Sequence, residues 1–146
     1  MITEGSEPTT RFGRLAVAAL AGTAAYFVYG FLVNGLLLRD AYRPYSSVYR
    51  PTEAVMALFP LGIAGIFVAI LVLAVLLARA GGSGAGADAR LGLLAGVFVA
   101  CTHVLDNYVT LNIGGALAME IAAASVVQWM LVAVVVGRVC GAGSRA

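Results

Sequence analysis

The stretch TEAVMALFPLGIAGIFVAILVLAVLLAR, residues 52–79, decides the fold class of this chain. No charged residue lies between Glu53 and Arg79, so the apolar run exceeds the roughly 18 residues that mark a membrane span. A helix on the surface of a soluble core would place polar residues along one face, and this stretch lacks that pattern. It therefore predicts a helix that crosses a lipid bilayer.

The whole chain shares this apolar character. Its 146 residues are 62% hydrophobic and 11% charged, against about half and about a quarter in soluble domains. The formal charge of +2 includes nine arginines, which are spread thinly and form no basic stripe. We therefore expect the lipid bilayer as the main surrounding and no nucleic acid as a partner.

Three further apolar stretches predict three more transmembrane helices. Together with the first stretch, they place spans at residues 15–38, 52–79, 90–111 and 116–138. The last two spans are joined by a turn so short that it forces the two helices to pack antiparallel. The sequence therefore predicts an all-α fold, an integral membrane bundle of four antiparallel transmembrane helices.

This bundle is expected to form a single domain over residues 11–138. Residues 1–10 predict a flexible N-terminal tail, and residues 139–146 predict a short C-terminal tail. The glycine-rich segment AGGSGAGADA, residues 80–89, predicts a flexible linker between two hairpins. A cleaved secretory signal is the alternative for the first span, but the apolar run continues well past the small residues at 21–25 that mimic a cleavage site.

The arginines predict the orientation of the bundle. Six lie at the end that holds the termini: Arg11, Arg14, Arg79, Arg90, Arg138 and Arg145. Three lie at the other end: Arg39, Arg43 and Arg50. Because the cytoplasmic ends of membrane helices carry the excess of positive residues, we expect a multi-pass protein of the bacterial inner (plasma) membrane with both termini in the cytoplasm.

Polar side chains within the third span predict a buried site in the outer half of the bundle. They follow i, i+3, i+4, i+7 spacing and are His103, Asp106, Asn107 and Thr110. An ionisable group at mid-bilayer costs at least about 2.5–3.5 kcal/mol, so such residues need a reason. The same face continues into Gly92 and Gly96, small residues that allow close helix packing. We therefore expect the polar cluster to point into the bundle.

The fourth span adds Glu120 and, two turns later, Gln128. A symmetric hairpin would place Asn107 level with Glu120, so that Asp106 and Glu120 approach one another. Two carboxylates in a dry site cannot both ionise easily, so the pair would retain a proton near neutral pH. An ion pair between His103 and Asp106 is the alternative arrangement. The sequence leaves both open.

The first two spans contribute further candidates. Residues recurring every four positions on one face of the first span mix small and hydrogen-bonding side chains: Gly22, Tyr26, Gly30 and Asn34. In the second span, Pro60 lacks the N–H that would bond the carbonyl of Met56, which predicts a kink. We expect the hydrogen-bonding face of the first span to complete the polar site.

Other chemistries find no support in the sequence. A single histidine, His103, disfavours haem held by two histidines, and no metal-ligand spacing is present. Cys101 and Cys140 lie at opposite levels of the predicted bilayer, so we expect no disulfide between them. We also find no nucleophile and base in motif form. The sequence therefore predicts no catalytic residue, no metal and no cofactor, and disfavours an enzyme.

Two segments and the small-residue last helix around Glu120 resemble a group of small bacterial four-helix integral membrane proteins of unknown function. The segments are GFLVNGLLLRDAY, residues 30–42, and HVLDNYVTLN, residues 103–112. The resemblance implies a four-helix membrane fold, with Asp40, Asp106 and Glu120 at the family's acidic positions. Because that family carries no assigned activity, the resemblance implies no function.

Two functional hypotheses follow from the sequence. The first is a small permease-like or ligand-binding membrane protein, expected to be a homo-oligomer, in which Asp106 and Glu120 exchange a proton. The second is a non-catalytic structural or accessory subunit that packs a small-residue face against a membrane protein partner. In that case the polar residues are a hydrogen-bonded lock that fixes helix register.

Overall fold

The computed structural model of the chain describes residues 8–80 and 84–142, and within them all regular structure is helical. The elements in chain order are α1 (Pro8–Gly30), η1 (Phe31–Leu37), α2 (Arg39–Tyr42), η2 (Arg43–Tyr45), α3 (Thr52–Arg79), α4 (Ala85–Val99), η3 (Ala100–Val104), α5 (Leu105–Thr110) and α6 (Gly115–Ala142). The segments η1 and η3 are π-helical, and η2 is a 3₁₀-helix. Each π segment continues a long α-helix, so the chain forms four long helical stretches.

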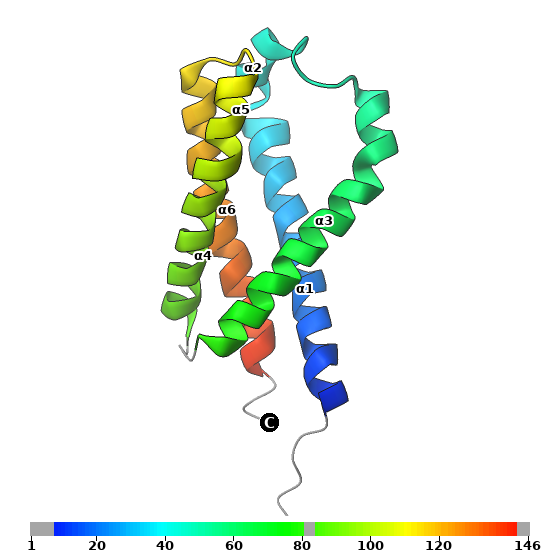
Figure 1. Cartoon of the computed structure of the whole chain (residues 1–146), viewed down its shortest axis with the longest axis vertical. Helices are drawn as coiled ribbons and strands as arrows, with labels where there is room; N and C mark the ends of the chain where they lie inside the picture. The colour runs from blue at the N-terminus through cyan, green and yellow to red at the C-terminus, as the bar shows by residue number, and fades with distance from the viewer. Residues whose placement is uncertain (1–7, 81–83, 143–146) are drawn as a thin grey trace, which may run out of the picture.

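These four stretches are long and apolar enough to cross a membrane, which indicates a multi-pass membrane protein. They are Phe12–Leu37, Thr52–Arg79, Ala85–Thr110 and Gly115–Gly141. Figure 1 shows the start of α1 and the end of α6 at one end of the molecule and α2 at the other. We call the half near the start of α1 and the end of α6 the proximal half, and the half near α2 the distal half.

The buried core lies in the proximal half, where α1, α3 and α6 meet and α4 packs against α6. It consists of Ala18, Ala19, Ile70, Leu73, Ala74, Trp129, Val132, Ala133 and Val136. Alanines and β-branched residues dominate it, and such short side chains allow helix backbones to approach closely.

Three of the glycines predicted at helix-packing positions lie where two helices approach one another closely. A side-chain carbon added to Gly22 would lie 2.6 and 2.7 Å from methyl groups of α6 and α3. One added to Gly92 would lie 2.6 Å from the carbonyl oxygen of Trp129, and one added to Gly96 would lie 2.7 Å from the Cα atom of Val126. The small-residue faces of α1 and α4 are therefore covered by helices of the same chain.

The helix α3 packs into the buried core only through its proximal half, and in its distal part the ring of Phe59 packs edge-on against Phe27 of α1, with centroids 5.5 Å apart. Ile70, Leu73 and Ala74 are buried there, whereas every residue from 55 to 65 is exposed. Figure 1 shows α3 as a bent helix whose distal part runs apart from α1. Pro60 lies within that distal part, and proline removes one bond of the helical ladder.

The predicted linker is partly helical, because α4 begins at Ala85. Gly84 precedes it with a φ of 102°, a conformation that favours glycine. Asp88 in the first turn suits the positive end of the helix, and it is only 8% exposed because its carboxylate lies directly over Gly137 of α6. The prediction of a flexible linker was therefore wrong over residues 85–89, where alanines favour a helix and packing on α6 fixes it.

The ends of the long helices also extend into the predicted tails. Residues 8–10 belong to α1, and residues 139–142 belong to α6. The remainder of the predicted tails and the linker residues 81–83 lie outside the described residues.

Candidate functional site

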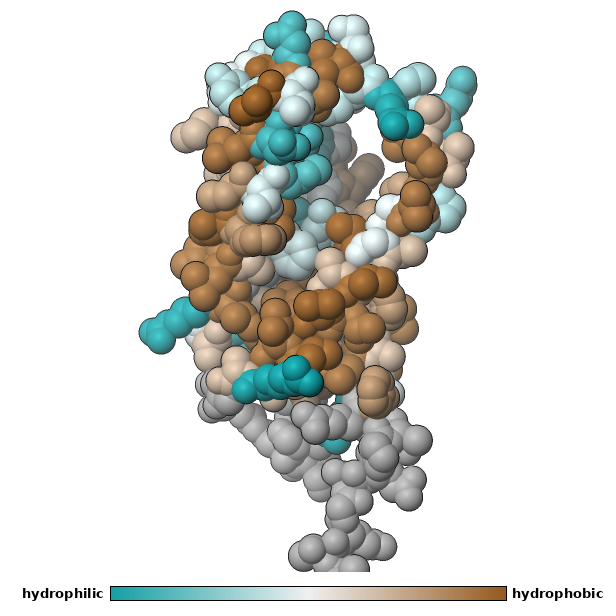
Figure 2. All heavy atoms as spheres, viewed as in Figure 1, coloured by the Kyte–Doolittle hydropathy of each residue, from teal (hydrophilic) through white to brown (hydrophobic). Residues whose placement is uncertain are grey.

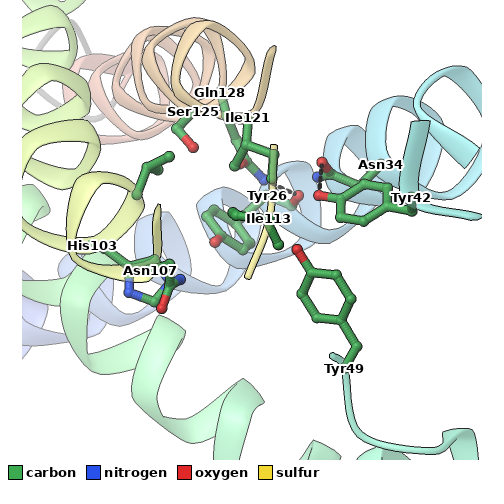
Figure 3. Close-up of a pocket in the computed structure, with 11 residues that line it drawn as sticks. Tyr26, Asn34, Tyr42, Tyr49, His103, Asn107, Ile113, Ile121, Ser125 and Gln128 are labelled. Atoms are coloured by element: carbon green, nitrogen blue, oxygen red, sulfur yellow. Dashed lines mark hydrogen bonds between the residues drawn. The ribbon is translucent and has the colours of Figure 1, made fainter. Parts of the chain in front are cut away.

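A polar pocket of about 240 Å³ lies in the distal half, away from the apolar core. Its lining comes from α1, η1, α2, η3, α5, α6 and their connections, and Figure 3 shows these side chains around the cavity. The lining residues are Tyr26, Asn34, Tyr42, Tyr49, His103, Val104, Asn107, Ile113, Ile121, Ser125 and Gln128. The pocket therefore brings together five of the residues predicted to form the polar site.

Both π segments border this pocket. Asn34 lies in η1 and His103 lies in η3. A π turn closes its hydrogen bonds across five residues instead of four, so it interrupts the regular spacing of an α-helix. Because π segments inside α-helices occur frequently at functional sites, their position supports this pocket as the candidate site.

Gln128 closes the floor of the pocket toward the core. Its Nε2 atom donates a hydrogen bond of 2.8 Å to the backbone carbonyl of Tyr26, and the residue is only 6% exposed. A side-chain carbon added to Gly30 would lie 3.4 Å from the same nitrogen, so α1 passes close to this amide. Beneath the amide, the ring of Tyr26 packs edge-on against Trp129 with centroids 5.9 Å apart. The floor is thus a packed joint between α1 and α6.

Tyr42 closes the opposite side of the pocket. Its hydroxyl donates a hydrogen bond of 3.2 Å to Oδ1 of Asn34, and its ring packs edge-on against Tyr49 with centroids 5.6 Å apart. Burial, with smaller contributions from Tyr49 and the negative charge of Glu120, raises the pKa of Tyr42 to about 12. The Tyr42 hydroxyl therefore remains a protonated donor at neutral pH.

A small apolar cluster covers the side of the pocket that Tyr42 closes, which we call the roof. Ile113, Leu117 and Ala118 are buried, and the connection after α2 packs on them through residues that include Tyr45. A side-chain carbon added to Gly114 would collide with the Tyr45 hydroxyl, so this ring lies directly against the turn before α6. The roof thus closes the distal end of the pocket.

The side wall carries neutral hydrogen-bonding groups. Asn107 Nδ2 lies 3.3 Å from His103 Nε2, in a contact whose donor depends on the histidine tautomer, and Ser125 adds a hydroxyl from α6. No aspartate, glutamate, lysine or arginine is among the described residues that line the pocket. Hydroxyls and amides offer both donors and acceptors, so this lining suits an uncharged polar group.

The two predicted carboxylates do not line the pocket. Asp106 on α5 and Glu120 on α6 are both exposed, so this structure does not place Asp106 inside the bundle as the sequence predicted. The physical reason lies in η3, whose longer turns interrupt the α-helical spacing of this face: Val104 is 2% exposed, and Asp106 after it lies on the surface. His103 is exposed as well, but at the pocket wall.

The other predicted features lie away from the pocket. Pro60 is exposed on α3, Cys101 is exposed on η3, and Cys140 lies near the end of α6; both cysteines are free thiols. Among the residues that the structure describes, no three histidine, cysteine, aspartate or glutamate side chains form a group that could hold a metal ion.

Sequence reasoning missed three polar lining residues, Tyr42, Tyr49 and Ser125. The two tyrosines follow the first span, where aromatic rings indicate anchors at the membrane boundary, so their fold back over the pocket had no signal in the pattern. Ser125 lies three residues before Gln128 on one helix face, a spacing that could have identified it.

Comparisons with protein-family models, curated proteins and solved structures found no match to this chain. The resemblance of residues 30–42 and 103–112 to small bacterial four-helix membrane proteins stays a prediction.

Proposed function

We propose that this chain is an antiparallel transmembrane bundle that binds a ligand through an uncharged, hydrogen-bonding group held in the distal pocket. The observation that carries the proposal is a cavity with neutral polar side chains that lies between three of the four long apolar helices. Polar groups inside an apolar helical protein are expensive unless paired, and their convergence around an open volume supports a binding role.

Ligand binding is better supported than proton exchange through the two carboxylates. Asp106 and Glu120 are exposed and contribute nothing to the lining of the pocket. Tyr42, Asn34 and Gln128 instead supply fixed hydrogen-bonding groups whose positions are held by contacts between helices. Such prior ordering lowers the entropic cost of binding.

The membrane placement forms part of the proposal. The excess of arginines at the proximal end supports cytoplasmic termini and a distal pocket on the opposite side of a bacterial inner membrane.

Native mass spectrometry of the protein in lipid nanodiscs tests the binding function. We expect a small adduct on the wild type that Ser125→Phe removes, because the ring fills the cavity beside η3. The matched control is Ala123→Phe, two residues away on the exposed side of α6, which should keep the adduct. An adduct that persists in Ser125→Phe, or its absence from the wild type, would refute the proposed binding site.

An accessory subunit is the second candidate, and the exposed distal part of α3 favours it. The faces of Gly22 and Gly92 are already covered within the chain, whereas every residue from 55 to 65 on α3 is exposed and available to a partner or a second copy. The same mass spectra would then show a second polypeptide bound equally to wild type and Ser125→Phe.

A further inference from the structure

We infer that the ligand is an amphiphile that reaches the pocket sideways from the bilayer, with an uncharged head in the cavity and a hydrocarbon tail beside α3. The inference rests on the proposed binding function and adds the class of ligand and its route.

The two ends of the pocket are closed by packing. At the floor, the buried amide of Gln128 bonds the backbone of Tyr26, and the core begins directly beneath at Trp129. At the roof, Tyr42 bonds Asn34 and the connection after α2 packs on Ile113 and its neighbours. A ligand that arrived along the long axis of the molecule would have to break one of these layers.

The side facing α3 is crossed by one contact, the edge-on packing of Phe59 against Phe27 of α1, and has no wall of lining residues. Among the described residues, none from α3 lines the pocket, although α3 packs against α1 and α6 in the proximal half. Carbons added to Gly62 or Gly65 would meet no atom within 4 Å, so α3 has open space beside these two glycines. Figure 2 shows a hollow beside distal α3, with hydrophilic residues across from it.

The volume of the pocket limits what can occupy it. Sites that bury a drug-sized ligand measure about 300–1,000 Å³, whereas this cavity measures about 240 Å³. It therefore holds a compact head group, and the remainder of a larger ligand must lie outside, through the open side.

The chemistry on the two sides of the opening matches an amphiphile. Inside, aliphatic side chains share the lining with hydroxyls, amides and one imidazole, and these polar groups bond hydroxyl or ester oxygens without a counter-charge. Outside, the exposed side chains of distal α3 are large and apolar: Val55, Met56, Leu58, Phe59, Leu61 and Ile63. A tail beside them would stay in hydrocarbon while the head stays hydrogen-bonded.

Trp129 provides a reporter for this route, because it is the single tryptophan of the chain. It is 7% exposed and contacts Tyr26, which lines the pocket. The probe is a monoacylglycerol carrying bromines near its head, titrated into nanodiscs of phosphatidylcholine. We expect saturable quenching of Trp129 fluorescence, and only weak, linear quenching by phosphatidic acid brominated at the same positions, since its charged head does not fit the neutral lining.

Variants assign the saturable quenching to the pocket. Ser125→Phe should abolish it, and Ala123→Phe should retain it. Asn107→Leu removes one hydrogen-bonding group without filling the cavity. It should therefore weaken binding and raise the half-saturating concentration about fivefold.

The control probe is glycerol, which carries the same head without a tail. We expect glycerol in the aqueous phase to leave the quenching by the brominated lipid unchanged at equal concentration. Linear quenching by the monoacylglycerol, or equal saturation by phosphatidic acid, would overturn the inference. If Ser125→Phe still removes a water-soluble adduct in native mass spectrometry while lipid quenching stays linear, the binding function holds and the lipid route fails.

Discussion

At the scale of single residues, the pocket depends on a few side chains that bridge separate helices. Gln128 donates to the backbone of Tyr26 across 102 positions of sequence, and Tyr42 donates to Asn34 from beyond the end of the first long helix. In apolar surroundings an unpaired amide or hydroxyl is costly, so these bonds fix where α1, α2 and α6 stand relative to one another. The remaining donors and acceptors are then free to face the cavity.

Tyr42 gives a pH prediction at this scale. Its pKa is raised from 10.0 to about 12 by burial, Tyr49 and Glu120, so between these values the unfolded chain loses the proton that the folded chain retains. Stability from this group is therefore complete below pH 10 and falls as the pH rises toward about 12. Glu120→Gln removes one cause of the shift, so we expect Tyr42 to ionise at lower pH than in the wild type.

Phenolate absorbance measures this effect, with each protein compared against the same protein carrying Tyr42→Phe so that the difference reports Tyr42 alone. Asp106→Asn is the matched control, because Asp106 is exposed and contributes nothing to the shift of Tyr42. An equal change of the midpoint in both variants would contradict the placement of Glu120 near Tyr42.

At the scale of elements, the arrangement of the helices depends on which glycines lie at a contact between two helices and which do not. Gly96 on α4 faces the backbone of α6, whereas Gly65 on α3 faces open space. Both are glycines inside apolar helices, but only Gly96 belongs to the small-residue face predicted from the sequence. The structure assigns them opposite roles.

The pair Gly96→Ala and Gly65→Ala tests this assignment. The alanine carbon at 96 would lie 2.7 Å from the Cα atom of Val126, so α4 and α6 must separate, at a cost of about 1–3 kcal/mol. The carbon at 65 meets nothing within 4 Å, and alanine favours the helix by about 0.5–1 kcal/mol over glycine. Unfolding of the detergent-solubilised variants measures both changes. Equal destabilisation by the two substitutions would contradict the packing described above.

The long apolar runs made the helices predictable, whereas the details of the site were not. Thr52–Arg79 lacks any alternative to a long apolar helix, and His103 and Asn107 followed helical spacing into the pocket. The π segments shift that spacing, and nothing in ACTHV or FLVNGLL marks a π turn, so the exposure of Asp106 could not be foreseen. The return of Tyr42 and Tyr49 over the pocket depends on tertiary packing with Ile113, which no local pattern encodes.

At the scale of the whole molecule, four apolar helices form a scaffold with a closed proximal core and a polar pocket in the distal half. The proposed orientation places the connection between α2 and α3 outside and the connection between α3 and α4 in the cytoplasm. Membrane crossing by all four helices requires these two connections to lie on opposite sides.

Cysteine labelling in intact cells tests this topology, in a background with both native thiols replaced by serine. We expect a membrane-impermeant maleimide to label Ser47→Cys directly and to label Ala80→Cys only after the membrane is opened, since both positions are exposed. Labelling of both sites in intact cells would mean that α3 does not cross the bilayer. The reverse pattern would invert the proposed orientation and leave the four spans intact.

The proposed site of binding is the neutral pocket and not the pair of carboxylates. The most direct measurement is the native mass spectrum in nanodiscs of two variants side by side, Ser125→Phe and the double variant Asp106→Asn/Glu120→Gln. We expect Ser125→Phe to lose the ligand adduct and the double variant to keep it, because of these three residues only Ser125 lines the cavity. Loss of the adduct in the double variant, with retention in Ser125→Phe, would contradict binding in the neutral pocket. It would instead assign binding to Asp106 and Glu120.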